Sequence, residues 1–169
     1  MIAELLVIVA LPLLLAAAAG WDLASFTIPN FLTAAVLAAF AVFAVAAGLS
    51  WPVIGFHLLA GLLGLVLGFT LFAAGWIGGG DAKLFAAVAL WLGFHDLLPY
   101  ALLASVFGGL LTLGLLSLRQ VHLPGALARQ GWIVKLHDAR SGIPYGVALA
   151  AGAFALLPST EIFRLAASA

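Results

Sequence analysis

Residues 53–81 read VIGFHLLAGLLGLVLGFTLFAAGWIGGGD, an apolar run that ends in three glycines and Asp81. The apolar part, residues 53–74, is about as long as the 20-residue helix that crosses a bilayer. Its apolar residues are continuous, whereas the strands of a membrane β-barrel alternate and are about 10 residues long. Because a chain in lipid must satisfy its own backbone hydrogen bonds, the stretch predicts a transmembrane helix. A glycine turn that carries an acid follows this helix.

The composition of the whole chain agrees with this prediction. Of its 169 residues 66% are hydrophobic and 7% are charged, and six Lys and Arg balance six Asp and Glu. A mean hydropathy of +1.30 is that of an integral membrane protein, and the length suits a single membrane domain, residues 1–169. The zero net charge gives no indication of a nucleic-acid partner, and the absence of cysteine excludes disulfides and thiolate metal sites.

Six apolar segments are expected to form helices, so the predicted fold class is an all-α polytopic membrane bundle of about six transmembrane helices. The first segment contains Glu4 but no Lys or Arg, which favours a retained helix over a cleaved secretory signal. Gly64 and Gly68 form a GxxxG pair that favours packing within the bundle or, alternatively, a dimer face, so the oligomeric state stays open. The segments are residues 2–20, 31–49, 53–74, 82–93, 97–118 and 144–163.

The basic residues predict the orientation in the lipid bilayer. With six spans, the connections 21–30, 75–81 and 119–143 share one side, which the positive-inside rule places in the cytoplasm with both termini outside. The long connection mixes apolar and basic residues and is interpreted either as an amphipathic piece on the membrane surface or as a solvated linker. Five of the six basic residues lie in or next to these connections, namely Lys83, Arg119, Arg129, Lys135 and Arg140.

Asp22 and Asp81 are the candidate catalytic residues, because acids are costly in a membrane protein and mark functional sites. Two carboxylates at one site divide the roles of base and acid: one activates a water molecule and the other polarises the scissile carbonyl. Gly78, Gly79 and Gly80 leave room for an extended substrate beside Asp81 and can adopt positive φ angles. Their backbone groups are then available to pair with a substrate strand. The alternative is an ordinary glycine turn between helices.

Lys83, two residues after Asp81, has two interpretations. Its charge acts on the acid pair, or the residue marks the cytoplasmic boundary of a helix and extends its amine toward the interface. The four histidines have no partner at the helical spacing i, i+4, so no metal site is expected. No nucleotide- or dinucleotide-binding motif is present, and no cofactor is expected.

Three segments, in this order, resemble the motifs of the type IV prepilin peptidase family. Residues 22–30, DLASFTIPN, resemble the first motif, in which an aspartate precedes Ile-Pro-Asn. Residues 78–84, GGGDAKL, resemble the second motif, GxGD followed by x-Lys-Leu. Residues 143–148, IPYGVA, resemble the Pro-Tyr-Gly segment that opens the last helix of the family. The three motifs together extend over nearly the whole chain.

The resemblance implies an aspartic endopeptidase of the GxGD type, which removes the basic leader of prepilin-like precursors, usually after a glycine, at the cytoplasmic face of the bacterial inner membrane. It also implies the short form of the family, without the methyltransferase domain and its cysteine-bound zinc, as in tight-adherence pilus systems. Members often carry Arg or Lys between the first aspartate and Ile-Pro-Asn, whereas residues 23–27 here are uncharged. The implied catalytic residues are Asp22 and Asp81, and the residues implied to bind substrate or shape the site are Gly78, Gly79, Gly80, Lys83, Ile28, Pro29, Asn30, Pro144, Tyr145 and Gly146.

Two other functions stay open from the sequence. One is a small polytopic transporter whose acids bind protons or cations, and the other is an inactive homologue that serves as a scaffold in pilus assembly. A transporter is expected to place its acids near the middle of the membrane on broken helices, whereas these acids are predicted at one edge. Cleavage of a precursor separates the enzyme from both alternatives.

Overall fold

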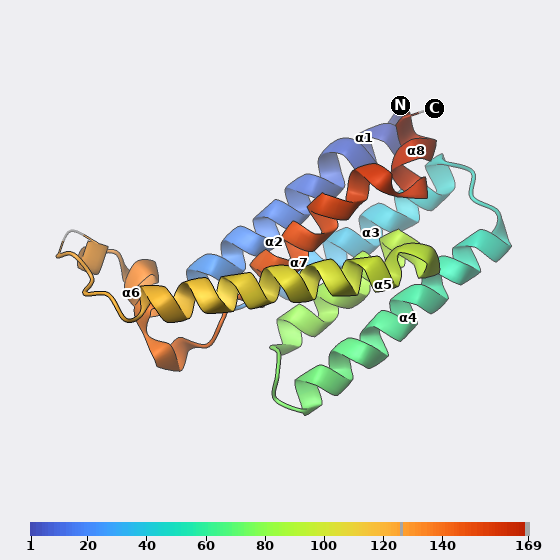
Figure 1. Ribbon diagram of the computed structural model, residues 1–169. Helices are drawn as coiled ribbons and strands as arrows, with labels where there is room; N and C mark the ends of the chain where they lie inside the picture. Colours follow the sequence, from blue (N-terminus) through green and yellow to red (C-terminus); the bar gives the residue numbers. More distant parts are fainter. Residues whose placement is uncertain (126, 168–169) are drawn as a thin grey trace.

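The computed structural model describes residues 1–125 and 127–167, and this part of the chain is helical without a strand. The N-terminal helix is continuous and consists of α1 (Ile2–Leu5), a π-helical stretch (Leu6–Ala10) and α2 (Leu11–Ser25). The arrangement in Figure 1 confirms the predicted all-α class. The other helices are α3 (Asn30–Ala46), α4 (Trp51–Ala73), α5 (Gly79–Leu118), α6 (Gly131–His137), α7 (Tyr145–Leu156) and α8 (Glu161–Ala167), with 3₁₀ turns at Leu127–Arg129, Ala139–Ser141 and Leu157–Ser159.

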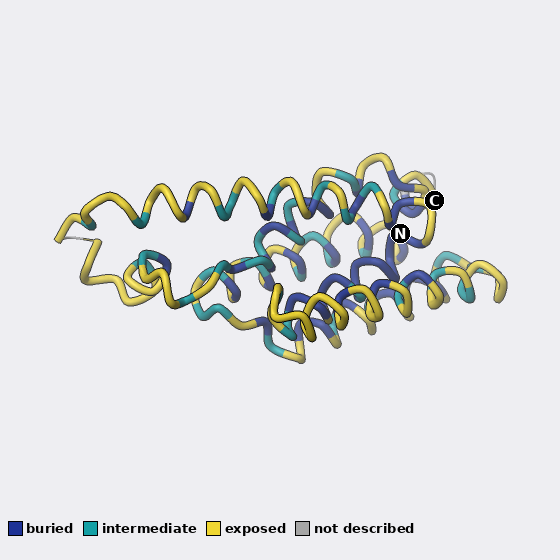
Figure 2. The backbone as a smooth tube through the Cα atoms, turned by 60° about the horizontal axis from the view of Figure 1, so that its bottom comes forward, coloured by how far each residue is buried: buried dark blue, intermediate teal, exposed yellow. Residues whose placement is uncertain are grey.

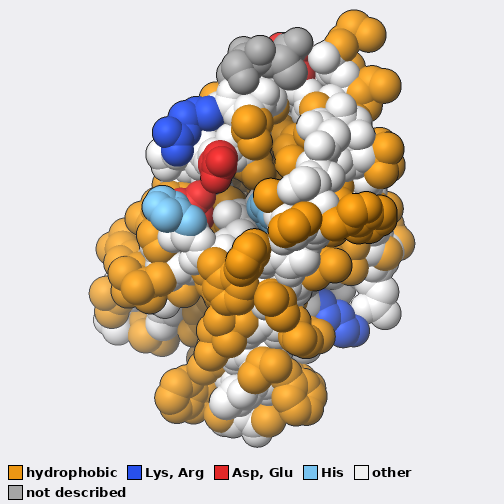
Figure 3. All heavy atoms as spheres, turned by 90° about the vertical axis from the view of Figure 1, so that its right-hand side faces the viewer, with side chains coloured by type: hydrophobic (Ala, Val, Ile, Leu, Met, Phe, Trp, Pro, Cys, Tyr) orange, Lys and Arg blue, Asp and Glu red, His pale blue; other side chains and the backbone are white. Residues whose placement is uncertain are grey.

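Long apolar helices make this a membrane bundle. Within the described part of the chain, Ile2–Ser25, Trp51–Ala73 and Gly79–Leu118 are long and apolar enough to cross a membrane, and Asn30–Ala46 and Tyr145–Ser159 are shorter apolar helices. Much of the outer surface of the helices is exposed (Figure 2), and the face drawn in Figure 3 is mostly hydrophobic. An exposed apolar surface of this extent suits contact with lipid rather than water. The polytopic membrane class is confirmed, while the number of six crossings stays a prediction.

The helix α5 reverses its direction at Gly93. This residue has φ 72° and ψ −177°, a backbone conformation that glycine adopts readily. The rings of Phe85 and Tyr100 stack with centroids 5.2 Å apart, although a straight helix would separate these residues by about 22 Å. The two arms, residues 79–92 and 94–118, are therefore antiparallel neighbours, as Figure 1 shows. The reversal confirms the predicted division between the fourth and fifth apolar segments.

Two predicted boundaries are wrong. The first helix continues to Ser25 instead of ending at Gly20, so Asp22 lies inside its last turn rather than beyond it. The last apolar segment is not one helix, because the chain leaves α7 through the 3₁₀ turn Leu157–Ser159 before α8 begins. Pro158 within this turn lacks the N–H group that a continuing α-helix needs.

Glycines on α4 let the first arm of α5 approach closely and thereby position Asp81. A Cβ atom on Gly64 would lie 2.7 Å from the Cβ atom of Ala89, and one on Gly68 would lie 2.9 Å from the carbonyl oxygen of Ala82. Small residues permit such a close approach of two backbones. The GxxxG pair is thus used for packing within the bundle, and Gly68 faces the residue next to Asp81.

The connections that flank the candidate acids meet at one end of the bundle. Both termini lie together at the opposite end in Figure 1. Ile28, in the turn between α2 and α3, approaches Gly80, and Lys135 of α6 donates a hydrogen bond to the carbonyl oxygen of Ser25 at 2.8 Å. The shared end that the predicted orientation requires is present, and its cytoplasmic location stays a prediction.

Candidate active site

Asp22 is held by the first turn of α7. The side chain is buried, and its Oδ2 atom accepts a hydrogen bond from the backbone N–H of Gly146 at 2.8 Å. Gly146 is the second residue of α7, so its N–H belongs to the first turn, where amides have no acceptor within the helix. The positive end of the helix dipole also favours a negative charge at this position. The segment Pro-Tyr-Gly, residues 144–146, thus orients an acid that lies 124 positions earlier.

Asp81 lies in the first turn of α5, and its two carboxylate oxygens have different environments. The Oδ2 atom accepts a hydrogen bond from the N–H of Gly78, the residue before the helix, at 3.0 Å. The Oδ1 atom is buried and has no hydrogen-bond partner among the described residues. An unsatisfied buried oxygen costs free energy, which a water molecule or a substrate group offsets on binding. Asp81 is therefore fixed through one oxygen and available for chemistry through the other.

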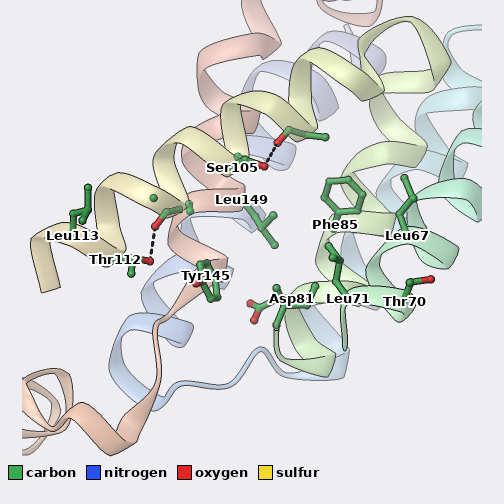
Figure 4. A pocket seen from close by; sticks show the side chains of 16 residues that line it. Leu67, Thr70, Leu71, Asp81, Phe85, Ser105, Thr112, Leu113, Tyr145 and Leu149 are labelled. Carbon is green, nitrogen blue, oxygen red and sulfur yellow. Dashed lines mark hydrogen bonds between the residues drawn. The ribbon is translucent and has the colours of Figure 1, made fainter. Parts of the chain in front are cut away.

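The structure brings the two candidate catalytic residues together. Gly146 donates to Asp22, and Ile28 lies against both Gly146 and Gly80, the residue before Asp81, so the two acids are neighbours. Their exposed fractions are 4% and 7%, so both carboxylates are largely withdrawn from solvent. Such a pair can divide the roles of acid and base in hydrolysis. Figure 4 shows the carboxylate of Asp81 pointing from α5 toward Tyr145 at the start of α7.

Tyr145 and Pro144 place the start of α7 beside the acids. Tyr145 lines the same cavity as Asp81, and its ring carbons Cδ1 and Cε1 would lie 3.4 Å from a Cβ atom on Gly108. Pro144 is buried and precedes the first residue of α7. A proline costs little at a helix start, because its missing N–H would have no acceptor within the helix. The predicted Pro-Tyr-Gly residues therefore lie at the site.

Ile28 packs against glycines of both other motifs. Its side chain is buried, and its Cδ1 atom would lie 2.8 Å from a Cβ atom on Gly146. Its Cβ and backbone N atoms would lie 3.1 and 3.2 Å from a Cβ atom on Gly80. Because interiors are close-packed, a methyl group at either glycine would force Ile28 or its neighbours to shift. Glycine at positions 80 and 146 lets Ile28 take its position without such a shift.

The three glycines before Asp81 make different contacts, and none of them uses the positive φ angles that glycine permits. Gly78 is extended, with φ −73°, while Gly79 and Gly80 are residues of α5 rather than a loop. A Cβ atom on Gly78 would lie 2.9 Å from Oδ2 of Asp81, whereas one on Gly79 would meet the ring of Phe72 at 3.4 Å, an ordinary contact. Glycine at positions 78 and 80 of the GGGD motif thus allows the close approach of Asp81 and Ile28, respectively.

Lys83 and Asn30 connect the two aspartate motifs. The Nζ atom of Lys83 donates a hydrogen bond to Oδ1 of Asn30 at 3.0 Å, which joins α5 to the first residue of α3. Pro29 precedes α3 with φ −62°, an angle that suits a helix start. No salt bridge joins Lys83 to either aspartate in the described part of the chain. Neither sequence-based interpretation of Lys83 included this hydrogen bond.

Replacing Lys83 with Met is expected to loosen the turn that carries Ile28 without removing an acid. The hydrogen bond involves an exposed cation, so its loss should cost less than about 1 kcal/mol of stability. A small displacement of the site should lower kcat/KM up to about tenfold. Asn30→Ala should have the same effect, and the double variant should be no worse than either single variant. Additive effects on thermal unfolding and cleavage would contradict a direct coupling.

The connection 119–142 contains α6, which docks on the end of α2. Lys135 donates from Nζ to the carbonyl oxygen of Ser25 at 2.8 Å, and its Nζ lies 5.2 Å from the ring centroid of Phe26. Phe26 ends α2 with φ 59°, a left-handed conformation. Arg119 holds the same region by donating to two of its carbonyl oxygens. The sequence analysis missed these contacts, because nothing local links Lys135 to a carbonyl 110 residues away.

The fold and the site define a class of protein: a helical membrane bundle with two buried carboxylates at one end. Among the described residues no group of three or more His, Asp or Glu side chains is placed to hold a metal ion. The model of the type IV leader peptidase family matches residues 9–113, more than half of the chain, and includes Asp22 and Asp81. The chain therefore belongs to this family of peptidases. No curated protein and no solved structure matches it.

Proposed function

We propose that this protein is an aspartic endopeptidase that removes the leader peptide of prepilin-like precursors, with Asp22 and Asp81 as its catalytic pair. The observation that carries the proposal is the meeting of two buried carboxylates, one bound by the N–H of Gly146 and the other with a buried, unpartnered oxygen. Membership of the type IV leader peptidase family supports the substrate class. Both acids lie at one end of the bundle, whereas a transporter is expected to bind its ion near the middle of the membrane.

The geometry supports hydrolysis by an activated water molecule. One carboxylate accepts a proton from the water, and the protonated partner donates to the oxygen of the scissile carbonyl. The water oxygen attacks the carbonyl carbon and forms a tetrahedral intermediate. Transfer of a proton to the amide nitrogen then breaks the C–N bond, which releases a new carboxyl group and a new amine. The unpartnered Oδ1 atom of Asp81 offers a contact for the water or the carbonyl.

We place this reaction at the cytoplasmic face of the bacterial inner membrane. The end of the bundle that holds both acids also holds Lys83 and the connection 119–143, which together contain five of the six basic residues. The positive-inside rule favours the cytoplasm for such an end. A leader peptide that stays in the cytoplasm would then reach Asp81 without crossing the bilayer.

Expression of a candidate prepilin with and without this protein tests the proposal. We expect the precursor to lose the mass of its leader only when the protein is present, as measured by mass spectrometry of the purified pilin. A precursor whose glycine before the cut is replaced serves as the control and is expected to keep its leader. If every prepilin keeps its leader, also with purified protein in detergent, the proposal is wrong and an assembly scaffold is favoured.

A further inference from the structure

A cavity opens beside Asp81 between the two arms of α5, α4 and α7 (Figure 4). Its volume is about 610 Å³, and most of its lining is apolar. Leu67 and Leu71 of α4 and Leu149 of α7 form part of its walls. Asp81 contributes the acid to this lining, so whatever fills the cavity lies next to a candidate catalytic group.

One wall of the cavity is a face of small residues on the second arm of α5. The spacing of these residues follows one side of a helix, and from the first to the last they extend over about 16 Å. Gly109 is open at this face, because a Cβ atom there would meet nothing within 4 Å. The helix α7 already packs on this face at Ala104 and Gly108, whereas Ser105 and Gly109 are exposed. Small residues at the exposed positions let the backbone of another helix approach closely in a membrane. The residues are Ala101, Ala104, Ser105, Gly108, Gly109 and Thr112.

Three hydroxyl groups of the lining already have a hydrogen-bond acceptor within their own helix. Thr70, Ser105 and Thr112 each donate to the carbonyl oxygen four residues earlier in their own helix, at 2.7 Å. The Oδ1 atom of Asp81, in contrast, is buried without a partner, and its carboxylate points into the cavity in Figure 4. A fitting occupant is therefore apolar along the small-residue face and offers a polar group to Asp81.

We infer that this cavity holds an apolar helical segment of the substrate, packed on the small-residue face of α5, with the peptide bond to be cut at Asp81. The inference rests on the proposed function and adds to it how the substrate is held. A helix of about 11 residues matches the length of the face. A peptide, unlike a lipid chain, also supplies the carbonyl and N–H groups that Asp81 can bind where the helix ends.

A matched pair of variants tests the inference. Gly109 lines the cavity and Gly114 does not, and both have open space where a side chain would extend. Gly109→Leu should lower kcat/KM about tenfold for a precursor that contains its apolar segment, because the leucine fills the groove. Cleavage of a short soluble peptide that contains only the cut site should not change. Gly114→Leu should leave both rates at the wild-type level.

Photocrosslinking gives an independent test that does not depend on how well Gly109→Leu folds. Leu113 and Leu110 are similarly exposed, at 65% and 60%, but only Leu113 is among the residues that line the cavity. A photoreactive phenylalanine at position 113 of the Asp22→Asn protein should crosslink to the apolar segment of an uncut precursor. The same group at position 110 should not.

The outcomes separate this inference from the proposed function. If the wild type cuts neither precursor nor peptide, the proposed function is wrong. If the wild type cuts the precursor while Gly109→Leu matches Gly114→Leu, or loses equal activity on precursor and peptide, the inference about the groove is wrong. Crosslinks to lipid alone at position 113 would also overturn it. If the wild type cuts only the precursor, the crosslinks decide.

Discussion

Changing Asp22 or Asp81 to Asn is expected to lower kcat for precursor cleavage by about a thousandfold. Asparagine keeps the shape of the side chain and an oxygen that accepts the N–H of Gly146 or Gly78. It neither takes a proton from water nor gives one to a carbonyl as a carboxyl group does. The loss should therefore be chemical, with helix content and thermal unfolding close to those of the wild type. Cleavage of a purified precursor in detergent measures it.

Two comparisons make this prediction specific. Because the two acids act as one unit, the variant that carries both changes should be about as slow as either single variant. Asp138 is an exposed acid in the connection 119–143, where it accepts a hydrogen bond from the backbone N–H of Arg140 at 2.9 Å. Asp138→Asn is the matched control and should cleave at nearly the wild-type rate. If Asp22→Asn or Asp81→Asn cleaved the precursor at nearly the wild-type rate, the proposed mechanism would be wrong.

The meeting of the two acids at one end could be predicted by counting apolar segments. Two such segments, residues 31–49 and 53–74, separate Asp22 from Asp81. An even number of crossings returns a chain to the side from which it started, and the structure has both acids at one end of the bundle. The break at Gly93 could also be predicted from the sequence, because polar residues follow this glycine before the next apolar run.

The contacts that orient the acids could not be predicted in this way. The membrane helices are apolar on all sides, so the periodicity of the sequence does not show which face of each helix is turned inward. The packing of Ile28 between Gly80 and Gly146 depends on how each helix is rotated about its axis. The end of α2 was predicted too early, at Gly20, because a glycine lowers helix propensity by about 1 kcal/mol. Tertiary packing, which the sequence pattern does not show, outweighs this cost. Lys135 then satisfies the carbonyl of Ser25 at the true end.

Gly146→Ala is expected to lower kcat/KM about a hundredfold, although Gly146 has no side chain to take part in chemistry. A Cβ atom at this position would lie 2.8 Å from Cδ1 of Ile28, and 2.9 and 3.0 Å from Oδ2 and Cβ of Asp22. Relief requires Asp22 to move, which disturbs its hydrogen bond to the N–H of residue 146. The crowding should also cost about 1–3 kcal/mol of stability, measured by thermal unfolding in detergent.

Gly20→Ala is the matched control, because Gly20 lies in α2 two residues before Asp22 and a Cβ atom there would meet nothing within 4 Å. It should leave both stability and cleavage nearly unchanged. Ile28→Val removes Cδ1, the atom nearest to the added methyl group of Gly146→Ala, so it should cost less stability in that background than in the wild type. Cleavage should stay low in the double variant, because the contacts with Asp22 persist. Full recovery of cleavage there would show that Gly146 serves the packing of Ile28 and not the placement of Asp22.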